Sequence, residues 1–336
     1  MGTYVAMAMH EARARPAPVT RDIPEPGPDD AVVRITASSM NFHDMVNLQG
    51  RIPGPWPRVP MSDGAGVVVA VGDRVRRVVV GDRVNVAFHP DWLSGPPTPE
   101  LRRQVLGDSR DGCLQQYLAV RASALVRVPS HLTDLEAATL PCAGVTAWSA
   151  LRAGGLAPGQ VVVAQGTGGV SLFVVQLAKA HGATVILTSS SDAKLEIGAS
   201  LGADHLVNYQ RCADWHDEVR ALTDGRGADI VVDVGGAETL GKSVLATRMG
   251  GTVPIVGVLT GAATAAIPLS VAMMRNISLV GITVGSVADH DALCRAIAAA
   301  RIRPHISHTL PWDEMPEAMR VLAENEHVGK IAIRLP

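Results

Sequence analysis

A glycine-rich turn between an apolar run and a helical pattern has the residue types that hold a phosphate group. Val161 to Ala164 form an apolar run rich in valine, and a helical pattern follows the turn over 172–181. Glycine permits a tight turn and a close approach of backbone to phosphate oxygens, while the first N–H groups of a helix are unpaired and partly positive. We therefore predict that a dinucleotide pyrophosphate binds the backbone of Gly166, Thr167, Gly168, Gly169 and Val170. A plain tight turn is the alternative, because the third glycine position of the motif holds Ser171.

A polar cluster follows the next apolar run, 184–187, where a ribose-binding carboxylate is expected about 20 residues after the first glycines. The cluster ends in serines, and the nearest carboxylate, Asp192, comes too late to sit at the strand tip. Without that carboxylate a 2′-phosphate is not repelled, and the hydroxyls of Ser189 and Ser190 with the ammonium of Lys194 could bind it. We therefore expect NADPH rather than NADH. The alternative is that the serines cap the following helix and Lys194 is solvated.

Bulk properties indicate a two-domain globular protein. The chain has 336 residues, a net charge of −2, 47% hydrophobic residues and 18% charged residues. This length favours two domains, and the charge gives no field for holding nucleic acid, so no nucleic-acid partner is expected. No uncharged apolar stretch reaches about 18 residues and the start lacks the order of an export signal, which predicts a cytoplasmic protein with no membrane contact.

Two regions with different predicted secondary-structure patterns must position these residues. Residues 31–128 read as a β-rich, barrel-like region with short strands at 31–36, 66–71, 82–87, 113–119 and 125–128. The irregular stretch 89–112 is long enough to predict a substrate-side flap. From 129 to about 285 strands alternate with helices, which is typical of an α/β fold with a doubly wound parallel sheet. Helices at 288–300 and 314–323 and a strand at 329–334 are expected to return to the first domain.

The last strand predicted in the sheet, 278–284, is apolar and would leave a bare edge. Such an edge invites pairing with another chain. We therefore expect it to pair with its symmetry mate in a homodimer.

Several motifs occur in one order along nearly the whole chain: Ser62 to Gly72, Val80 to Val84, Ala137 to Pro141 and the glycine-rich turn. Together they resemble the medium-chain dehydrogenase/reductase superfamily, and within it the zinc-free quinone oxidoreductase branch. The resemblance implies a GroES-like catalytic domain at 1–128, completed by 286–336, and a Rossmann dinucleotide-binding domain at 129–285.

The resemblance also locates the positions that hold catalytic zinc in the alcohol dehydrogenases of this superfamily. Here they read Asn41, Ser62 and Cys142, with Asp63 in place of the backing glutamate. One thiolate with an amide and a hydroxyl does not make a tetrahedral zinc site. We therefore expect no zinc and no other metal, with Cys142 a small buried apolar residue. The alternative is a metal held at low affinity by Cys142, Asp63 and His43.

Without zinc, hydrogen-bond donors must stabilise the charge that develops on a substrate oxygen. By resemblance, Asn41 lines the pocket and Thr146 lies near the nicotinamide; the alternatives are a polar cap at the end of a strand for Asn41 and a helix-face hydroxyl for Thr146. His43 stands where the zinc enzymes begin a proton relay and could donate a proton, although a solvated or packing histidine is the competing interpretation. Its neighbour Asp44 is expected to hold backbone.

The resemblance adds three residues to the cofactor site. Tyr209 joins Ser189, Ser190 and Lys194 at the adenosine-phosphate side, and Val256 and Gly257 end a strand facing the nicotinamide. Lys330 could reach the phosphate, but a solvated lysine is the favoured interpretation.

These expectations converge on an NADPH-dependent, zinc-independent reductase that transfers hydride to a quinone or an α,β-unsaturated carbonyl. Two alternatives stay open: an alcohol or aldehyde dehydrogenase-reductase of the same superfamily, and an NADPH-binding sensor protein with little turnover.

Overall fold

The computed structural model describes residues 2–264 and 266–336, and the chain divides into two compact units. The first unit comprises Met1–Val145 and Val284–Pro336, and the second comprises Thr146–Thr283. The predicted domain bounds, 1–128 with 286–336 and 129–285, stay a prediction. The two compact units differ from them mainly in placing 129–145 with the first unit, because the helix in this segment packs on that unit's sheet.

A seven-stranded sheet is the centre of the first unit. Its order is β14-β15-β3-β4-β5-β7, with β6 paired to β3. The bounds are β3 Asp30–Met40, β4 Ala65–Val71, β5 Arg83–Val86, β6 Tyr117–Arg121, β7 Leu125–Arg127, β14 Ile306–Pro311 and β15 Lys330–Arg334. The strands β1 (Thr3–Ala8) and β2 (Ala17–Asp22) form a separate antiparallel pair.

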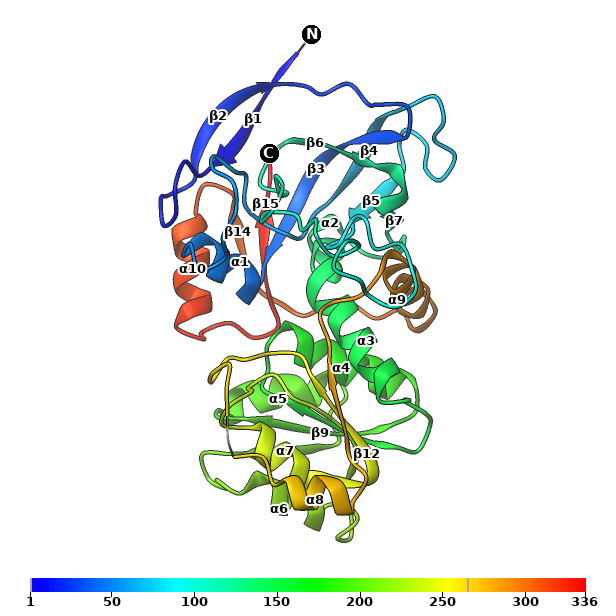
Figure 1. Cartoon of the computed structure of the whole chain (residues 1–336), viewed down its shortest axis with the longest axis vertical. Helices are drawn as coiled ribbons and strands as arrows, with labels where there is room; N and C mark the ends of the chain where they lie inside the picture. The colour runs from blue at the N-terminus through cyan, green and yellow to red at the C-terminus, as the bar shows by residue number, and fades with distance from the viewer. Residues whose placement is uncertain (1, 265) are drawn as a thin grey trace. The chain divides into compact units, whose positions relative to one another are not determined.

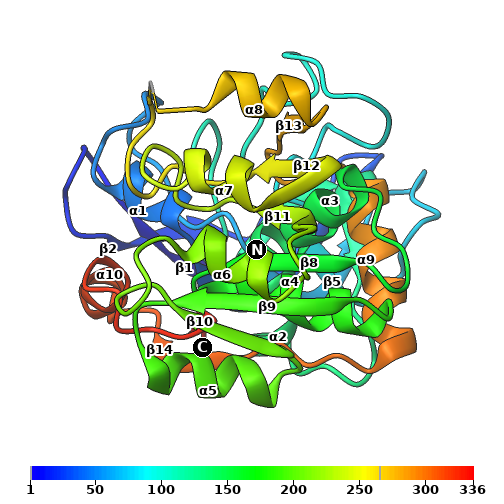
Figure 2. The same cartoon turned by 90° about the horizontal axis from the view of Figure 1, so that it is seen from below.

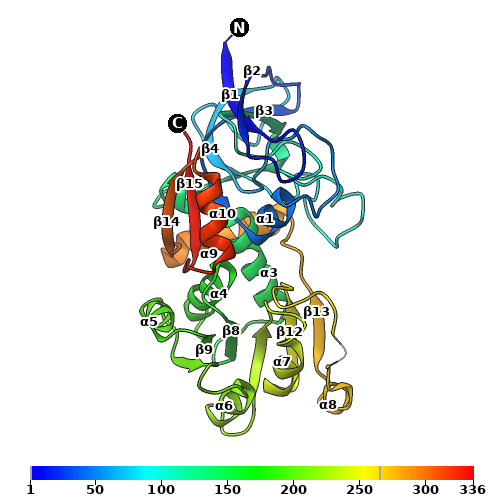
Figure 3. The same ribbon diagram turned by 90° about the vertical axis from the view of Figure 1, so that its left-hand side faces the viewer.

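The end of the chain returns to this sheet, as the sequence predicted. Strand β15 runs antiparallel to β3 with Ile331 opposite Met40, and both views in Figures 1 and 3 show it within the first unit. The helices of the unit are α1 Phe42–Leu48, α2 Asp134–Ala138, α9 Val287–Ala300 and α10 Met315–Ala323, with a 3-10 turn η1 at Ala122–Ala124 and a π-helical turn η2 at Leu140–Gly144.

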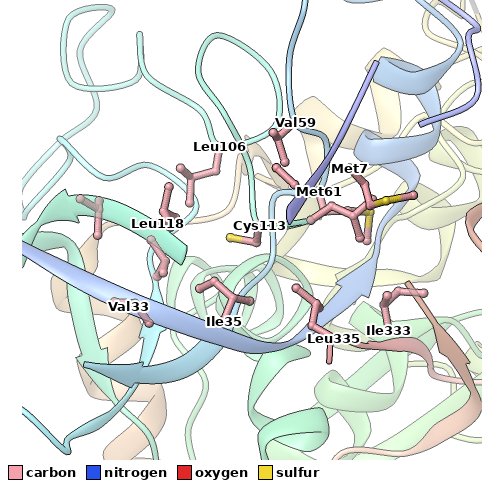
Figure 4. Close-up of a cluster of buried hydrophobic side chains, with 14 of the residues drawn as sticks. Met7, Val33, Ile35, Val59, Met61, Leu106, Cys113, Leu118, Ile333 and Leu335 are labelled. Carbon is pink, nitrogen blue, oxygen red and sulfur yellow. The ribbon is translucent and has the colours of Figure 1, made fainter. Parts of the chain in front are cut away.

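The core of the first unit is drawn from distant parts of the chain. Figure 4 shows one cluster of buried side chains to which β1, β3, the 106–118 region and the C-terminal residues Ile333 and Leu335 all contribute. Val33, Ile35, Leu106, Cys113 and Ile333 are each fully buried there. Burial of this apolar surface is the main force that holds the C-terminal segment on the N-terminal sheet.

The second unit is a parallel sheet with the order β10-β9-β8-β11-β12-β13 (Figure 2). Its strands are β8 Val161–Gln165, β9 Thr184–Ser189, β10 His205–Asn208, β11 Ala228–Val232, β12 Thr247–Ile255 and β13 Ser278–Gly281. The helices are α3 Val145–Ala153, α4 Gly169–Ala180, α5 Asp192–Ser200, α6 Trp215–Ala221, α7 Leu240–Ala246 and α8 Leu269–Met274. The strand order reverses between β8 and β11, so right-handed connections place helices on both faces. The predicted doubly wound α/β class is confirmed.

Local bounds differ from the sequence expectations near the candidate site. The strand expected at 31–36 extends to Met40, and Asn41 begins the short helix α1 that the sequence analysis did not predict. Strand β13 ends at Gly281, three residues before its expected end. Among the described residues, no helix is long and apolar enough to cross a membrane.

Candidate cofactor-binding edge and active site

The glycine-rich turn joins β8 to α4 in the second unit, as expected. Gly166 has a φ of +72°, a conformation that favours glycine, and its N–H donates to the carbonyl of Thr188 at 2.8 Å. The hydroxyl of Ser171 donates to the carbonyl of Gln165 at 2.5 Å. The serine at the third glycine position therefore ties the end of β8 to the start of α4.

The backbone of this turn borders open space. A Cβ atom built on Gly166 or Gly168 would meet no heavy atom within 4 Å. Gly168 is the N-cap of α4, and no side chain caps it with a hydrogen bond in the described structure. An uncapped helix start beside open backbone has the donors and the room that a pyrophosphate requires. Thr167, Gly169 and Val170 complete this segment.

The serines at and after the end of β9 have different roles. Ser191 caps α5, because its hydroxyl accepts from the N–H of Lys194 at 3.4 Å. Neither Ser189 nor Ser190 is the cap of α5, although the hydroxyl of Ser189 accepts from the N–H of Ser191 at 3.4 Å. The N–H of Tyr209 donates to the carbonyl of Ser189 at 3.0 Å, which holds the partly exposed tyrosine beside the cluster.

A further cation lies next to this cluster. The carboxylate of Asp192 accepts from the side-chain amide of Asn208 at 2.7 Å and pairs with the guanidinium of Arg211. This ion pair offsets the charge of the only carboxylate that the sequence places near the ribose position. Arg211 was not among the predicted site residues; its place two residues after Tyr209 was the available signal.

A buried carboxylate shapes the neighbouring strand end. Asp233 is fully buried and accepts from the N–H of Gly236 at 2.8 Å and from the hydroxyl of Ser243 at 2.5 Å. Its carbonyl accepts from the N–H of Val256 at 2.9 Å. A Cβ on Gly257 would lie 2.4 Å from the carbonyl oxygen of Val234, so only glycine fits there. Val256 and Gly257 are thus held after β12, at the carboxyl end of the parallel strands, where ligands of such sheets bind.

In the first unit, α1 starts at the end of β3 and fixes the backbone around Asn41. Asp44 accepts from the N–H of Asn41 at 2.9 Å and from the N–H of Ser62 at 2.8 Å. The expectation that Asp44 holds backbone is therefore confirmed. The cap interpretation of Asn41 also applies, since it is the N-cap of α1, but its side chain makes further contacts.

Asp63 is the centre of a buried polar cluster. One oxygen, Oδ1, accepts from the N–H of Cys142 at 2.9 Å. The other, Oδ2, accepts from the hydroxyl of Ser39 at 2.5 Å and from Nδ2 of Asn41 at 2.9 Å, and the ammonium of Lys330 lies 3.4 Å away. Burial raises the pKa of Asp63, while Lys330 and the hydrogen bonds from Ser39 and Asn41 oppose that rise. Each of these hydrogen-bond partners is a donor, as an ionised carboxylate requires, whereas the nearby carboxylate of Asp44 adds to the rise of the pKa.

Lys330 is buried, so the interpretation of a solvated lysine was wrong. Only 3% of the residue is exposed. Its ammonium donates to the carbonyl of Met40 at 2.8 Å and to Oδ1 of Asn41 at 2.5 Å. The pairing of β15 with β3 brings Lys330, the first residue of β15, beside Asn41. Because the two residues are 289 positions apart in the sequence, local sequence patterns could not predict this contact.

The positions that would hold zinc do converge, but their side chains do not fit the ion. Asn41 Nδ2 lies 3.4 Å from the hydroxyl of Ser62, and the N–H of Cys142 bonds to Asp63. Burial raises the pKa of the Cys142 thiol well above its usual value, which disfavours a thiolate ligand. Oδ1 of Asn41, the only amide ligand atom, already accepts from Lys330. Among the described residues no group of three His, Cys, Asp or Glu side chains could hold a metal ion.

The other two predicted catalytic residues lie in different units. His43 is on α1, with Nε2 4.0 Å from Oδ2 of Asp108 and its ring edge-on to Phe88 at 5.1 Å between centroids. Asp108 comes from the irregular stretch 89–112, which was predicted to be a flap. Thr146 is buried on α3, at the start of the second unit.

Comparisons with known proteins identify the families that the two parts of the chain match. Residues 27–130 match the family described as "Alcohol dehydrogenase GroES-like domain", and residues 169–299 match the family described as "Zinc-binding dehydrogenase". The chain is 37% identical to a "zinc-type alcohol dehydrogenase-like protein" of Schizosaccharomyces pombe, over 92% of this chain and 91% of that one.

Solved structures show the same fold. A putative alcohol dehydrogenase from Sinorhizobium meliloti aligns with a TM-score of 0.93 and 37% identity, covering 99% of this chain and 98% of that one. The 2-octenoyl-CoA carboxylase reductase CinF, solved in complex with NADP and 2-octenoyl-CoA, aligns with a TM-score of 0.86 and 28% identity over 99% and 88% of the two chains.

Proposed function

The chain belongs to the medium-chain dehydrogenase/reductase superfamily as an NAD(P)H-dependent oxidoreductase, and we propose that it transfers a hydride from NADPH to a quinone or an α,β-unsaturated carbonyl without zinc. One observation carries the proposal. At the zinc positions, the side-chain amide of Asn41 and the backbone N–H of Cys142 donate to Asp63, and Oδ1 of Asn41 accepts from Lys330, so these residues do not form a ligand set.

The chemistry of the acceptor follows from this network. Reduction of an aldehyde concentrates negative charge on one oxygen, where a Lewis-acid metal stabilises the transition state strongly. Hydride addition to the β-carbon of an enone leaves a delocalised enolate, and hydride transfer to a quinone leaves a delocalised aryloxide; hydrogen-bond donors can stabilise either anion. A site with an amide and hydroxyls but no metal ligand set therefore favours the delocalised product.

Support for NADPH comes from the adenosine end. Ser189 and Ser190 are not used as helix caps, and Arg211 neutralises Asp192. Together with Lys194 these residues provide donors and positive charge for a 2′-phosphate. The NADP bound to CinF, a protein of the same fold, agrees with this assignment.

The chain's own residues then have distinct tasks. When bound, NADPH supplies the hydride, and the backbone of residues 166–170 holds its pyrophosphate. Asn41 donates to the substrate oxygen, Thr146 contacts the nicotinamide side, and His43 donates the proton that completes the reduction. The half-buried setting of His43 beside Asp108 and Phe88 keeps its ring in one place.

An alcohol or aldehyde dehydrogenase-reductase is the second candidate, because the similar proteins of S. pombe and S. meliloti are named as an alcohol dehydrogenase-like protein and a putative alcohol dehydrogenase. A third candidate, an NADPH sensor with little turnover, predicts tight binding without consumption.

The test is NADPH oxidation by EDTA-treated protein with 1,4-benzoquinone, a simple enone and an aldehyde offered in parallel, and with NADH as the cofactor control. We expect turnover with the quinone or the enone, a preference for NADPH, and a loss of about tenfold or more in Asn41→Ala. The matched control is Gln49→Ala, an amide at the other end of α1, which should keep full activity. Aldehyde turnover that returns only with added zinc would favour the second candidate, and tight binding without turnover would favour the third.

A further inference from the structure

The buried cluster of the first unit contains a cation that belongs to the chain itself. We propose that the ammonium of Lys330 is the resident cation of this site: it fills the place that a metal ion would need and it aligns Asn41 as a hydrogen-bond donor. The inference rests on the proposed zinc-independent function and specifies how the site works without the metal.

The contacts of Nζ match the three donors of an ammonium group. Three acceptors surround Nζ: the carbonyl of Met40 at 2.8 Å, Oδ1 of Asn41 at 2.5 Å and Oδ2 of Asp63 at 3.4 Å. An ammonium has three N–H donors and no acceptor, so it satisfies all three oxygens. Because Asp63 is fully buried and Lys330 is 3% exposed, the pair is shielded from solvent.

The same contacts decide which way the Asn41 amide points. Lys330 can only donate, so it selects the oxygen of the amide, and Asp63 can only accept, so it selects the nitrogen. One Nδ2 hydrogen is used by Asp63 at 2.9 Å. The other has only long contacts, with Ser62 Oγ at 3.4 Å and the carbonyl of Ser39 at 3.5 Å, and is therefore the one available to a substrate oxygen.

Lys330 also strengthens that donor. A hydrogen bond to the oxygen of an amide polarises the group, and chains of hydrogen bonds reinforce one another where the surroundings are apolar. Charge that develops on a bound oxygen would thus be stabilised by Asn41 directly and by Lys330 through it. Lys330 is a positioning residue in this scheme.

Loss of the lysine alone would leave the Asp63 carboxylate buried without its cation, which can prevent folding. The first experiment is therefore a double-mutant cycle of Lys330→Met and Asn41→Ala, with Lys330→Met/Asp63→Asn replacing the first variant if it does not fold. The matched control is Lys179→Met, which removes the lysine of the surface pair Lys179–Asp204 at 2.8 Å.

We expect Lys330→Met to lower kcat about tenfold and to leave KM for NADPH within about twofold, because the lost interaction acts on the transition state. Lys330→Arg should recover most of the rate, and Lys179→Met should keep it. The double variant Asn41→Ala/Lys330→Met should be no slower than Asn41→Ala, because Lys330 acts through Asn41. Losses that multiply in the double variant, or an arginine variant as slow as the methionine one, would overturn the positioning role.

The second experiment has a readout that needs no turnover. The whole protein is dialysed with Co²⁺, whose bond to a thiolate gives a visible charge-transfer band. If Lys330 fills the cation position, the wild-type chain shows no such band. A stoichiometric band that disappears in Cys142→Ser would show that a metal can enter the cluster, and the inference would be wrong.

The two experiments separate this inference from the proposed function. If the metal-free protein reduces a quinone or an enone but the rate losses of Asn41→Ala and Lys330→Met multiply in the double variant, the proposed function stands and the role of Lys330 is rejected. Exclusion of Co²⁺ in a protein that reduces no acceptor would keep the resident cation and reject the function.

Discussion

At the scale of single residues, Gly168 allows cofactor binding to be tested apart from folding. Its φ of −76° is open to any residue, and an added Cβ would meet no heavy atom of the chain within 4 Å. Gly168→Ala should therefore fold, with only a modest loss of thermal stability because alanine is a poorer N-cap residue than glycine. Because its methyl group would enter the space assigned to the pyrophosphate, the Kd for NADPH should rise about tenfold or more, equivalent to at least about 1.4 kcal/mol.

The measurement is a fluorescence titration with NADPH beside a thermal melt. Gly281→Ala is the matched control, since a Cβ there also meets open space but lies on β13, separated from β8 by β11 and β12 in the sheet. Equal Kd values of Gly168→Ala and the wild type for NADPH would show that the pyrophosphate does not bind at this turn.

Sequence patterns and family resemblance located some residues of the candidate site and missed others. The glycine-rich turn between β8 and α4 was predictable because its residues are contiguous, so local strand, glycine and helix signals combine; that it binds a pyrophosphate stays a prediction. Asn41, Ser62 and Cys142 were located by motif order. The role of Lys330 was not predictable, because its burial depends on strand pairing with Met40, far along the chain. Arg211 was missed because its effect arises through an ion pair with Asp192.

At the scale of elements, Asp229 fastens three neighbouring strands of the second unit. It lies on β11, accepts from the N–H of Val161 on β8 at 2.8 Å, and pairs with Arg248 on β12 and with Arg226 at 2.7 Å. Burial tends to raise the pKa of Asp229, but hydrogen bonds from Arg226, Val161 and Arg248 outweigh it and lower the pKa to about 2.

The sign of the pH dependence follows from this shift. The pKa of an unfolded aspartate is about 3.9, so the folded protein binds this proton less tightly than the unfolded chain. The stabilisation is fully present above about pH 4 and is lost as the pH falls toward about 2. Asp229→Asn should cost about 1 to 2 kcal/mol at pH 7, after allowance for the partly exposed arginines, and much less near pH 2.5.

Urea unfolding at the two pH values measures the difference. Asp217→Asn, at an aspartate whose side chain is 75% exposed on α6, is the control and should leave the unfolding free energy unchanged at both. A cost for Asp229→Asn that is equal at the two pH values would show that its charge does not stabilise the sheet.

Elements were predicted best where apolar runs are long and bounded by glycine. The strands of the parallel sheet meet this condition because both of their faces are buried. Helix α1 was missed because it is seven residues long and starts through the Asn41–Asp44 contact, without a sustained apolar period. Strand β2 was missed because its residues alternate between exposed and half-buried, with no apolar run.

At the scale of the whole molecule, the second unit leaves an unpaired apolar surface. Within residues 2–264 and 266–336, strand β13 pairs with β12 alone, at the end of the sheet, and Leu279 on it is 37% exposed. Helix α8, drawn in the same orange as β13 at the end of the second unit in Figure 3, exposes 72% of Leu269 and 72% of Met273. Exposed apolar side chains beside a free edge are a hazard unless another chain covers them.

We propose that a second copy of the chain covers this surface, with β13 paired to its symmetry mate across a two-fold axis. A two-fold interface uses the same patch on both copies, and a free strand edge is self-complementary in its N–H and C=O groups. Light scattering on a sizing column should give the mass of a dimer for the wild type. Leu279→Lys/Met273→Lys should give the mass of a monomer, since lysine at an edge opposes pairing and burying its charge is costly.

Val79→Lys is the matched control, because Val79 is 59% exposed in the first unit and away from β13 in the chain. It should remain dimeric. Since the unit folds around its own core of Val163, Ile186 and Val231, the double variant should keep its fold, and circular dichroism should match that of the wild type. A wild-type monomer, or a double variant that stays dimeric, would mean that the edge of β13 is not the interface and that other features must protect it from aggregation.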